Sequence, residues 1–466
     1  MSALGAMTGR YGVFRAVAAI DKMPGDPFTT GYGVDVGYPS RLQPGPIART
    51  AGEAFPAWHC STGVAAEASH ARLIAFAEGH ERYAASILAP TAAFWATARE
   101  LGVDAVDLSR LPRLSASEYD LPGQWLVPPD PDAPIRWVRG WSLTHGRMVC
   151  VPAVIASMGI SPEHRGERIW LGVCNGFSVH SDVIAAVAGG ICECVERDAL
   201  TVAWLRRLPL PRVPLDEVSM EEVSAEVEDL IGSFRRSLLP LPLAFDATTE
   251  LGIPTYYLVS DAPHSEHAAT VVSCAASLSP RRAIAKALRE AITVRRFFDH
   301  EWEVPADPTD FNSVHHGASW AARPENGGIF GFLRTSRRRT TLGARSDLAT
   351  GDPQGDLELL ISRLDQHGME VIVVEVTTDE ARAAGLRAVR VFIPELVPIS
   401  FVHKSRFLGH PRVGDAGPRL GYAEALATAN PDPQPLCLSG VSCSPASRCS
   451  SATSSAPPSH GVSAAR

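Results

Sequence analysis

The sequence predicts an α+β fold in which mixed β-sheets are packed by helices. Four segments carry apolar residues at helical spacing, which favours helices over 67–88, 181–205, 280–298 and 356–368. Runs of strand-forming residues favour strands over 253–261, 269–279, 369–377 and 388–399. The two kinds of segment are interspersed without the rhythm of roughly 30 residues that βαβ units produce, which argues against a doubly wound sheet.

Local signals refine these elements. Residues 135–156 alternate as the two strands of a β-hairpin do. Ser181 or Asp182 is suited to cap the second helix, and Gly368 is suited to end the fourth. Residues 300–350 are polar and are expected to be mostly loop.

Composition divides the chain into three regions. Residues 1–57 are rich in Gly and Pro and are expected to form an N-terminal segment of strands and loops. Residues 58–436 have the mixed composition of a folded domain. Residues 437–466 are dominated by Ser, Ala, Pro and Cys, which bury too little apolar area to fold alone, so we expect a disordered tail.

The overall composition excludes several classes of function. A net charge of −8 and a pI near 6.0 argue against a general nucleic-acid-binding surface. The sequence contains neither a signal peptide nor an apolar run long enough to span a membrane. Its 9 cysteines form no C-x-x-C pair, so a zinc site is not indicated. These features predict a cytoplasmic protein with reduced thiols.

One acidic pattern occurs twice within apolar helices. Glu78 and Glu81 belong to "EGHER", and Glu193 and Glu196 belong to "ECVER". Carboxylates three positions apart share a helix face, where their like charges repel. A single copy is typical of a solvated helix face with ion pairs. Two copies among apolar neighbours favour buried carboxylates, whose charge a hard cation such as Mg²⁺ would balance.

The helix expected over 280–298 adds cations. Lys286 and Glu290 are four positions apart, as in an ordinary helical ion pair, and they are also suited to hold a polyphosphate beside a metal. The sequence contains neither a P-loop nor a strand-linked G-x-G-x-x-G, so common nucleotide folds are not indicated. No side chain stands out as a general base.

At this point the chain resembles a known family. The stretch "NGFSVHSDVIAAVAGGICECVERDAL" (175–200) resembles the core signature of the YcaO family, and "EASHARLIAFAEGHERYAA" (67–85) is similar to that family's first acidic helix. Similar segments occur at 271–298, 376–399 and 406–414, so that the resemblance covers about residues 8–436 in consistent order. It is greatest to the streptolysin-type (SagD-like) branch, whose cyclodehydratases form thiazolines and oxazolines in ribosomally made peptides.

The resemblance implies a YcaO-type fold with a non-kinase site for ATP and Mg²⁺ in residues 58–436, with 1–57 as its N-terminal segment. It implies four metal ligands: Glu78, Glu81, Glu193 and Glu196. The residues implied to contact phosphates or organise the site are Arg197, Lys286, Glu290 and Arg295. Asn175 and His180 would line the nucleotide pocket, although either could instead be an ordinary polar residue of a turn.

The chain departs from the family pattern at four positions: Ile74, Ala185, Ser273 and Thr293. Two alternatives to azoline formation therefore stay open. One is another ATP-dependent backbone modification, such as thioamide or amidine formation. The other is a docking subunit that keeps the fold without catalysing the reaction. A carboxylate-bridged di-iron protein is disfavoured, because neither acidic helix carries Glu-x-x-His.

A P-x-P-x-P motif occurs at Pro431, Pro433 and Pro435, and 31 residues follow it. Alone, it is typical of a polyproline linker. In the azoline-forming branch such a motif helps to arrange the active site, so the resemblance implies a catalytic role. Here the motif would either act from within the chain, or the 31 residues that follow it would disturb its action.

The resemblance predicts an enzyme that phosphorylates a backbone amide oxygen as a Cys, Ser or Thr side chain cyclises onto it. The expected partners are the precursor peptide, a leader-binding, E1-like protein and an azoline dehydrogenase, and the chain could form a homodimer. We expect the leader-binding protein to be separate, because the resemblance begins within about ten residues of Met1.

Overall fold

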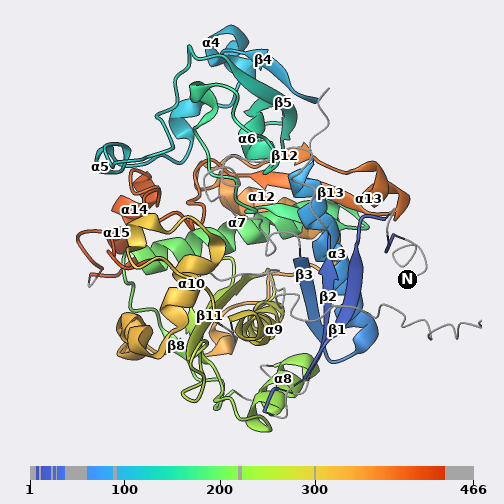
Figure 1. The fold of residues 1–466 in the computed structure, drawn as a ribbon, viewed down its shortest axis with the longest axis vertical. Coiled ribbons are helices and arrows are strands. Elements are labelled where there is room, and N and C mark those ends of the chain that lie inside the picture. Colours follow the sequence, from blue (N-terminus) through green and yellow to red (C-terminus); the bar gives the residue numbers. More distant parts are fainter. Residues whose placement is uncertain are drawn as a thin grey trace, which may run out of the picture.

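The computed structural model describes residues 7–9, 12–22, 25–27, 29–36, 60–87, 92–218, 223–298, 301–423 and 425–435. Within these residues the strands form three antiparallel sheets, and helices pack between and around them (Figure 1). The predicted α+β class is therefore confirmed. The predicted boundary at residues 57 and 58, and the predicted tail over 437–466, lie outside the described residues.

The first sheet has the order β1-β2-β3. Its strands are β1 (Ala16–Ile20), β2 (Thr30–Asp35) and β3 (Cys60–Ala65). The helix α3 (Ala68–Ser86) packs against β2 and β3. Its approach to β3 is close at Gly63, where an added Cβ would lie 1.9 Å from the carbonyl oxygen of Ala71. Glycine therefore permits α3, which carries the first acidic pattern, to pack directly on this sheet.

The second sheet has the order β11-β10-β9-β8. Its strands are β8 (Arg212–Val213), β9 (Leu243–Asp246), β10 (Thr255–Asp261) and β11 (Thr270–Ala276). The helix α9 (Pro280–Phe298) packs on β10 and β11 and also reaches β3 of the first sheet. On the outside, α9 packs against α8 (Ala225–Arg235), a helix that we did not predict.

The third sheet has the order β4-β5-β12-β13-β7, and β6 pairs with β5. Its strands are β4 (Phe94–Ala96), β5 (Ile135–Ser142), β6 (Arg147–Pro152), β7 (Phe177–His180), β12 (Ile372–Glu375) and β13 (Arg387–Phe392). The antiparallel pairing of β5 with β6 confirms the predicted hairpin. The helix α12 (Pro353–Asp365) lies over this sheet and packs against α7 (Val183–Leu205).

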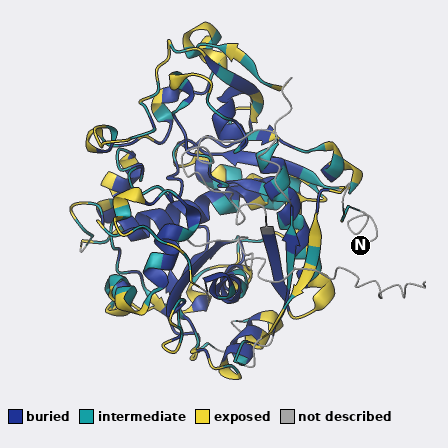
Figure 2. Cartoon of the chain, viewed as in Figure 1, coloured by how far each residue is buried: buried dark blue, intermediate teal, exposed yellow. Residues whose placement is uncertain are grey.

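The helix α7 occupies the centre of the fold, between the second and third sheets (Figure 1). It packs on β7 and β13 on one side and on β11 on the other. Its C-terminal half is buried on all sides, as is β11, so both are drawn in dark blue in Figure 2. Asp182 is its N-cap, since the Asp182 side chain accepts a hydrogen bond from the N–H of Ile184. The apolar sequence of α7 thus reflects its central position.

The prediction of loop over 300–350 is wrong in part. This region contains α10 (Val314–Ala322), whose Ala- and Gly-rich inner face packs on β11. The short helices are α4 (Ala98–Leu101), α5 (Ala116–Tyr119), α6 (Ala153–Ala156), α11 (Gly331–Arg334), α13 (Asp379–Ala383), α14 (Pro411–Gly414) and α15 (Ala416–Leu420). Among the described residues, no helix has the length and apolar character needed to cross a membrane.

Candidate active site

The fold brings the two acidic patterns together. Glu78 and Glu81 lie on α3, and Glu193 lies on α7. Burial raises the pKa of Glu78 to about 7 and that of Glu81 well above its ordinary value, and the charge of Glu193 adds to both shifts. Burial raises the pKa of Glu193 as well. Three carboxyl groups from α3 and α7 therefore lie close enough to disfavour one another's ionisation.

Cations from α7 and α9 compensate part of this negative charge. Lys286 Nζ lies 3.0 Å from Oε2 of Glu196, which is fully buried. Arg197 bridges the two glutamates of α7, with Nη2 3.4 Å from Glu193 Oε1 and Nη1 3.3 Å from Glu196 Oε1. Glu196 is thus a fully buried carboxylate that contacts two cations, one from its own helix and one from α9.

Backbone donors hold the carboxylates of α7 in place. The N–H of Gly176 donates to Glu193 Oε2 at 3.1 Å, and the N–H of Ala276 donates to Glu196 Oε2 at 3.3 Å. Gly176 has φ +75°, and an added Cβ would lie 2.2 Å from the carbonyl oxygen of Val391. Only glycine therefore fits at this turn, where the chain approaches β13 closely. This close approach explains the glycine at position 176, the second residue of the signature stretch 175–200.

The helix α9 completes the cluster. Glu290 Oε1 lies 3.7 Å from Lys286 Nζ, and burial raises the pKa of Glu290 to about 8. Burial alone would lower the pKa of Lys286, but the charges of Glu196 and Glu290 outweigh it and raise that pKa. Lys286 is thus a permanent cation at the centre of a group of carboxyl side chains.

The donor set of this cluster fits Mg²⁺ and a polyphosphate. Glu78 Oε2 and Asn175 Oδ1 are buried oxygens without a hydrogen-bond partner, as expected for atoms that await a ligand. Hard oxygens are the ligands that Mg²⁺ prefers, and Lys286 and Arg197 are suited to phosphate oxygens. In the part of the chain that the structure describes, however, no three acidic, His or Cys side chains already converge as a metal site requires.

Three of the predicted nucleotide residues lie in different environments. Asn175 is buried at the turn before β7, beside the Gly176–Glu193 contact. His180 ends β7, is exposed, and accepts a hydrogen bond at Nδ1 from the N–H of Asp182 at 3.0 Å. Arg295 donates to the carbonyl of Ser260 at 2.6 Å and to the carbonyl of Ala268. These contacts give Arg295 a role in holding β10, so its contact with phosphates remains a prediction.

The P-x-P-x-P motif is docked against α7. Pro433 and Pro435 are buried, and Gln434 Nε2 lies 3.2 Å from Thr201 Oγ1. Just before the motif, the N–H of Asn430 donates to the carbonyl of Leu205 at 2.7 Å. Thr201 is one helical turn after Arg197, so the motif approaches the cluster along α7. The buried, bonded segment does not behave as the polyproline linker that the composition also allowed.

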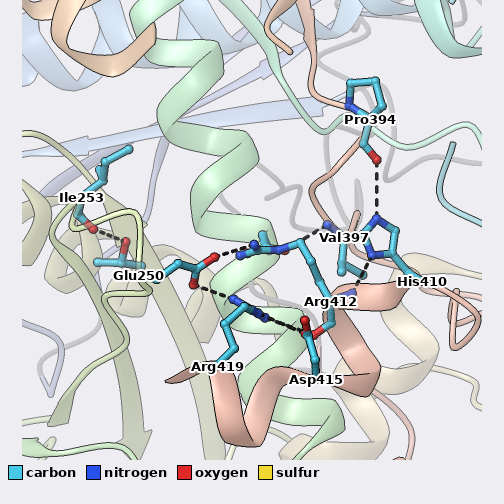
Figure 3. A network of polar contacts seen from close by, with 10 residues as sticks. Glu250, Ile253, Pro394, Val397, His410, Arg412, Asp415 and Arg419 are labelled. Atoms are coloured by element: carbon cyan, nitrogen blue, oxygen red, sulfur yellow. Dashed lines mark hydrogen bonds and ion pairs between the residues drawn. The ribbon is translucent and has the colours of Figure 1, made fainter. Parts of the chain in front are cut away.

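Sequence reasoning missed a buried ion network on the opposite side of α7 (Figure 3). Asp198 accepts from Arg412 Nε at 2.9 Å and Nη2 at 2.5 Å, and from the N–H of Val397 at 3.0 Å. Glu250 in turn pairs with Arg412 and Arg419. The position of Asp198 directly after the second acidic pattern was a sequence signal for a charged partner. That partner, Arg412, is 214 residues away in the chain, so the pair itself could not be predicted.

We expect Asp198→Asn to lower the free energy of unfolding by about 3 kcal/mol, because it leaves the buried Arg412 guanidinium short of a counter-charge. Chemical denaturation of the variant measures this difference. Asp415→Asn is the matched control, since Asp415 pairs with Arg419 in the same network but is 56% exposed. If Asp198→Asn lowers the free energy of unfolding no more than Asp415→Asn does, Asp198 does not stabilise the fold in the way we assign.

His410 should make stability depend on pH. Burial lowers the pKa of His410 to about 4, and its Nδ1 accepts from the N–H of Arg412 at 3.2 Å. Since the unfolded side chain binds a proton near pH 6.5 and the folded one does not, stability falls as the pH drops from 6.5 towards 4. His410→Asn keeps an acceptor at this helix N-cap without the titration. The unfolding free energy of the wild-type chain should fall between pH 7 and pH 5, and His410→Asn should make this fall smaller by about 2 kcal/mol. Chemical denaturation at the two pH values measures it.

Two of the four departures from the family pattern are satisfied locally. Ser273 Oγ donates to the carbonyl of Ala287 at 2.8 Å, which joins β11 to α9. Thr293 Oγ1 donates to the carbonyl of Arg289 within α9 at 3.2 Å. Ile74 lies next to Gly63, whose added Cβ would be 2.8 Å from the Ile74 Cβ. These side chains are therefore accommodated by the packing of the elements that carry the cluster.

Buried carboxylates beside cations, on helices that pack between antiparallel sheets, are suited to hold a metal ion and a polyphosphate. Residues 62–397 match the family model described as YcaO cyclodehydratase, ATP- and Mg²⁺-binding, and the chain belongs to this YcaO family. The resemblance in the sequence is thus confirmed at the level of the family. The YcaO domain binds ATP and Mg²⁺ and belongs to a family of ATP-dependent enzymes that modify peptide backbones.

Solved structures share the fold. A heterocyclase in complex with substrate and cofactor superposes with a TM-score of 0.73 at 22% identity, covering 91% of this chain and 55% of that chain. YcaO from Methanopyrus kandleri, bound with AMPPCP and Mg²⁺, gives 0.58 at 18% identity, covering 82% and 86%. The E. coli microcin synthetase McbBCD complex with pro-MccB17 bound gives 0.54 at 14%, covering 82% and 88%. The present chain spans about half the length of the heterocyclase that it matches.

Proposed function

We propose that this protein is an ATP- and Mg²⁺-dependent cyclodehydratase of the streptolysin type, which forms thiazolines or oxazolines in a ribosomally made precursor peptide. The observation that carries this proposal is the docked P-x-P-x-P motif. Pro433 and Pro435 are buried beside the helical turn that follows Arg197. This burial supports a role in arranging the active site, because a linker would lie in solvent.

In this proposal the chain supplies positions and charges. Glu78, Glu81, Glu193 and Glu196 hold Mg²⁺, and Arg197 and Lys286 neutralise phosphate oxygens. Bound ATP supplies the phosphoryl group that turns the amide oxygen of the cyclised peptide into a leaving group.

The remaining site residues support the same chemistry. Glu290 keeps Lys286 oriented, Asn175 and His180 line the nucleotide pocket, and Pro431, Pro433 and Pro435 shape the substrate side of the site. A Cys, Ser or Thr side chain of the substrate attacks the preceding carbonyl carbon. Loss of phosphate and of the amide proton then leaves the five-membered ring.

Partner proteins belong to the proposal. The E. coli synthetase that shares this fold is a complex of several subunits with its precursor bound. We therefore include a precursor peptide and a leader-binding, E1-like protein, which raises the local concentration of substrate by tethering. An azoline dehydrogenase that acts on the product, and a homodimer of this chain, complete the proposed assembly.

One observation favours a second candidate, a docking subunit without catalytic activity. Cations already pair with Glu193 and Glu196, and no ready-made metal cluster occurs among the residues that the structure describes. Another backbone modification, such as thioamide or amidine formation, would use the same residues and differs in its product.

The deciding experiment combines ATP consumption with product mass. With precursor peptide, we expect the isolated chain to consume ATP slowly and to form product slowly. Addition of the leader-binding partner should raise both rates. The product should lose one water for each ring, whereas a thioamide would exchange oxygen for sulfur. Glu78→Gln is the control for a contaminating ATPase. Full ring formation by the isolated chain would contradict the dependence on a partner, and no ATP use with the partner present would favour the docking subunit.

A further inference from the structure

A second cavity lies outside the candidate active site. It has a volume of about 340 Å³ and is bordered by α10, by the loop before β11 and by the segment that follows α9. Among the described residues that line it are Glu266, Glu301 and Glu325, which are exposed, and one permanently charged cation, Arg323. Within the described part of the chain, none of these glutamates is in an ion pair. The described lining therefore carries more negative than positive charge.

A buried hydroxyl without a hydrogen-bond partner lines the same cavity. Ser319 lines the cavity from α10 and is 6% exposed, and its Oγ has no hydrogen-bond partner. A serine within a helix usually satisfies its hydroxyl on the carbonyl four residues earlier. An unpaired buried hydroxyl is unfavourable, and an occupant that donates a hydrogen bond to its oxygen would relieve this cost.

An aromatic ring forms a fixed wall of this cavity. Trp302 lines it, and the indole N–H donates to the carbonyl of Phe297 at 3.3 Å. The ring also stacks on His315 with 4.6 Å between centroids. Because both contacts fix its orientation, Trp302 offers a rigid apolar surface against which methylene groups can pack.

These features select a particular kind of ligand. Glu266, Glu301 and Glu325 together with a hydroxyl and an aromatic wall suit a large organic cation that can reach several of them. A guanidinium group has five N–H donors in one plane and can bridge separated carboxylates and a hydroxyl. A volume of about 340 Å³ accommodates one long side chain. We propose that this cavity binds an arginine side chain of the peptide on which the enzyme acts.

The position of α10 relates this cavity to the C-terminal motif. An added Cβ on Gly317 would lie 2.5 Å from the carbonyl oxygen of Gln434, so that face of α10 contacts the motif. Ser319 is two positions further and therefore faces a different direction. A bound arginine would thus be held on one face of the helix whose other face supports the segment beside the active site. The identity of the peptide rests on the proposed function, whereas recognition of arginine does not.

The test measures binding of Nα-acetyl-arginine amide to the full chain by calorimetry, with the neutral isostere Nα-acetyl-citrulline amide as reference. We expect the arginine compound to bind at least about tenfold more tightly than the citrulline compound, and its binding to weaken with salt. The double variant Glu301→Gln, Glu325→Gln should lose this preference. Glu303→Gln removes a neighbouring exposed carboxylate outside the cavity and should keep it. Equal binding of both compounds, or equal effects of the two variants, would overturn the proposal.

Two further arms separate this proposal from the catalytic one. Glu78→Gln should keep arginine binding even though we expect it to lose ATP turnover, so failure of the proposed reaction leaves the binding result intact. Ser319→Ala should weaken arginine binding several-fold without unfolding the chain, because it removes a hydroxyl that has no partner. Spermidine that binds more tightly than the arginine compound would instead identify a free polyamine as the ligand and overturn the peptide source.

Discussion

Glu193→Gln and Glu196→Gln should each lower Mg²⁺-dependent ATP turnover by at least about 100-fold while the chain stays folded. Each substitution removes one negative oxygen but keeps the shape of the side chain. In Glu196→Gln, both Lys286 and Arg197 lose one of the two carboxylates with which they pair. In Glu193→Gln, the amide oxygen can still accept from the N–H of Gly176, so the loss of activity reports on charge.

Steady-state ATP consumption, with a circular-dichroism melt of each variant, measures this effect. Glu358→Gln is the matched control, because Glu358 is an exposed carboxylate on α12 that accepts a hydrogen bond from Gln354 in its own helix. Unchanged turnover in both variants would remove the cluster from the proposed active site. A collapse of the melting temperature would show instead that the carboxylates serve the fold.

Two truncations should have opposite results. Removal of residues 437–466 should leave stability unchanged, because their composition lacks core-forming residues, and activity should be maintained or raised. Removal of everything from Pro431 onward should lower activity by at least about tenfold. That cut exposes the end of α7, since it deletes the buried Pro433 and Pro435 and the contact of Gln434 with Thr201.

The ion pair of Asp432 with Arg207 provides the control for the second cut. Its atoms lie 2.5 Å apart, and both side chains are partly exposed, so Asp432→Asn should change stability by at most about 1 kcal/mol and leave activity unchanged. A large fall in melting temperature on removal of residues 437–466 would show that this region contributes to the fold. Equal activity of both truncated chains would remove the motif from the mechanism.

Periodicity predicted the long helices well. The helices over 68–86, 183–205 and 280–298 lie within two residues of the expected ranges, because each has an apolar face that repeats with the helical period. The helix α10 was not predicted. Its "VHHGASWAA" carries small and polar residues, and its burial depends on β11 and on the docked Gln434. Patterns within one segment cannot indicate such contacts.

The sequence by itself determined that two acidic pairs lie on two apolar helices, because residues three apart share a helix face whatever surrounds them. Only the tertiary structure decided which charges meet. Lys286 pairs with Glu196 across 90 residues of chain, and Arg412 pairs with Asp198 across 214. Such pairings follow from the way in which the second and third sheets pack around α7, and no local periodicity indicates them. The same holds for the P-x-P-x-P motif, whose burial is a property of the assembled core.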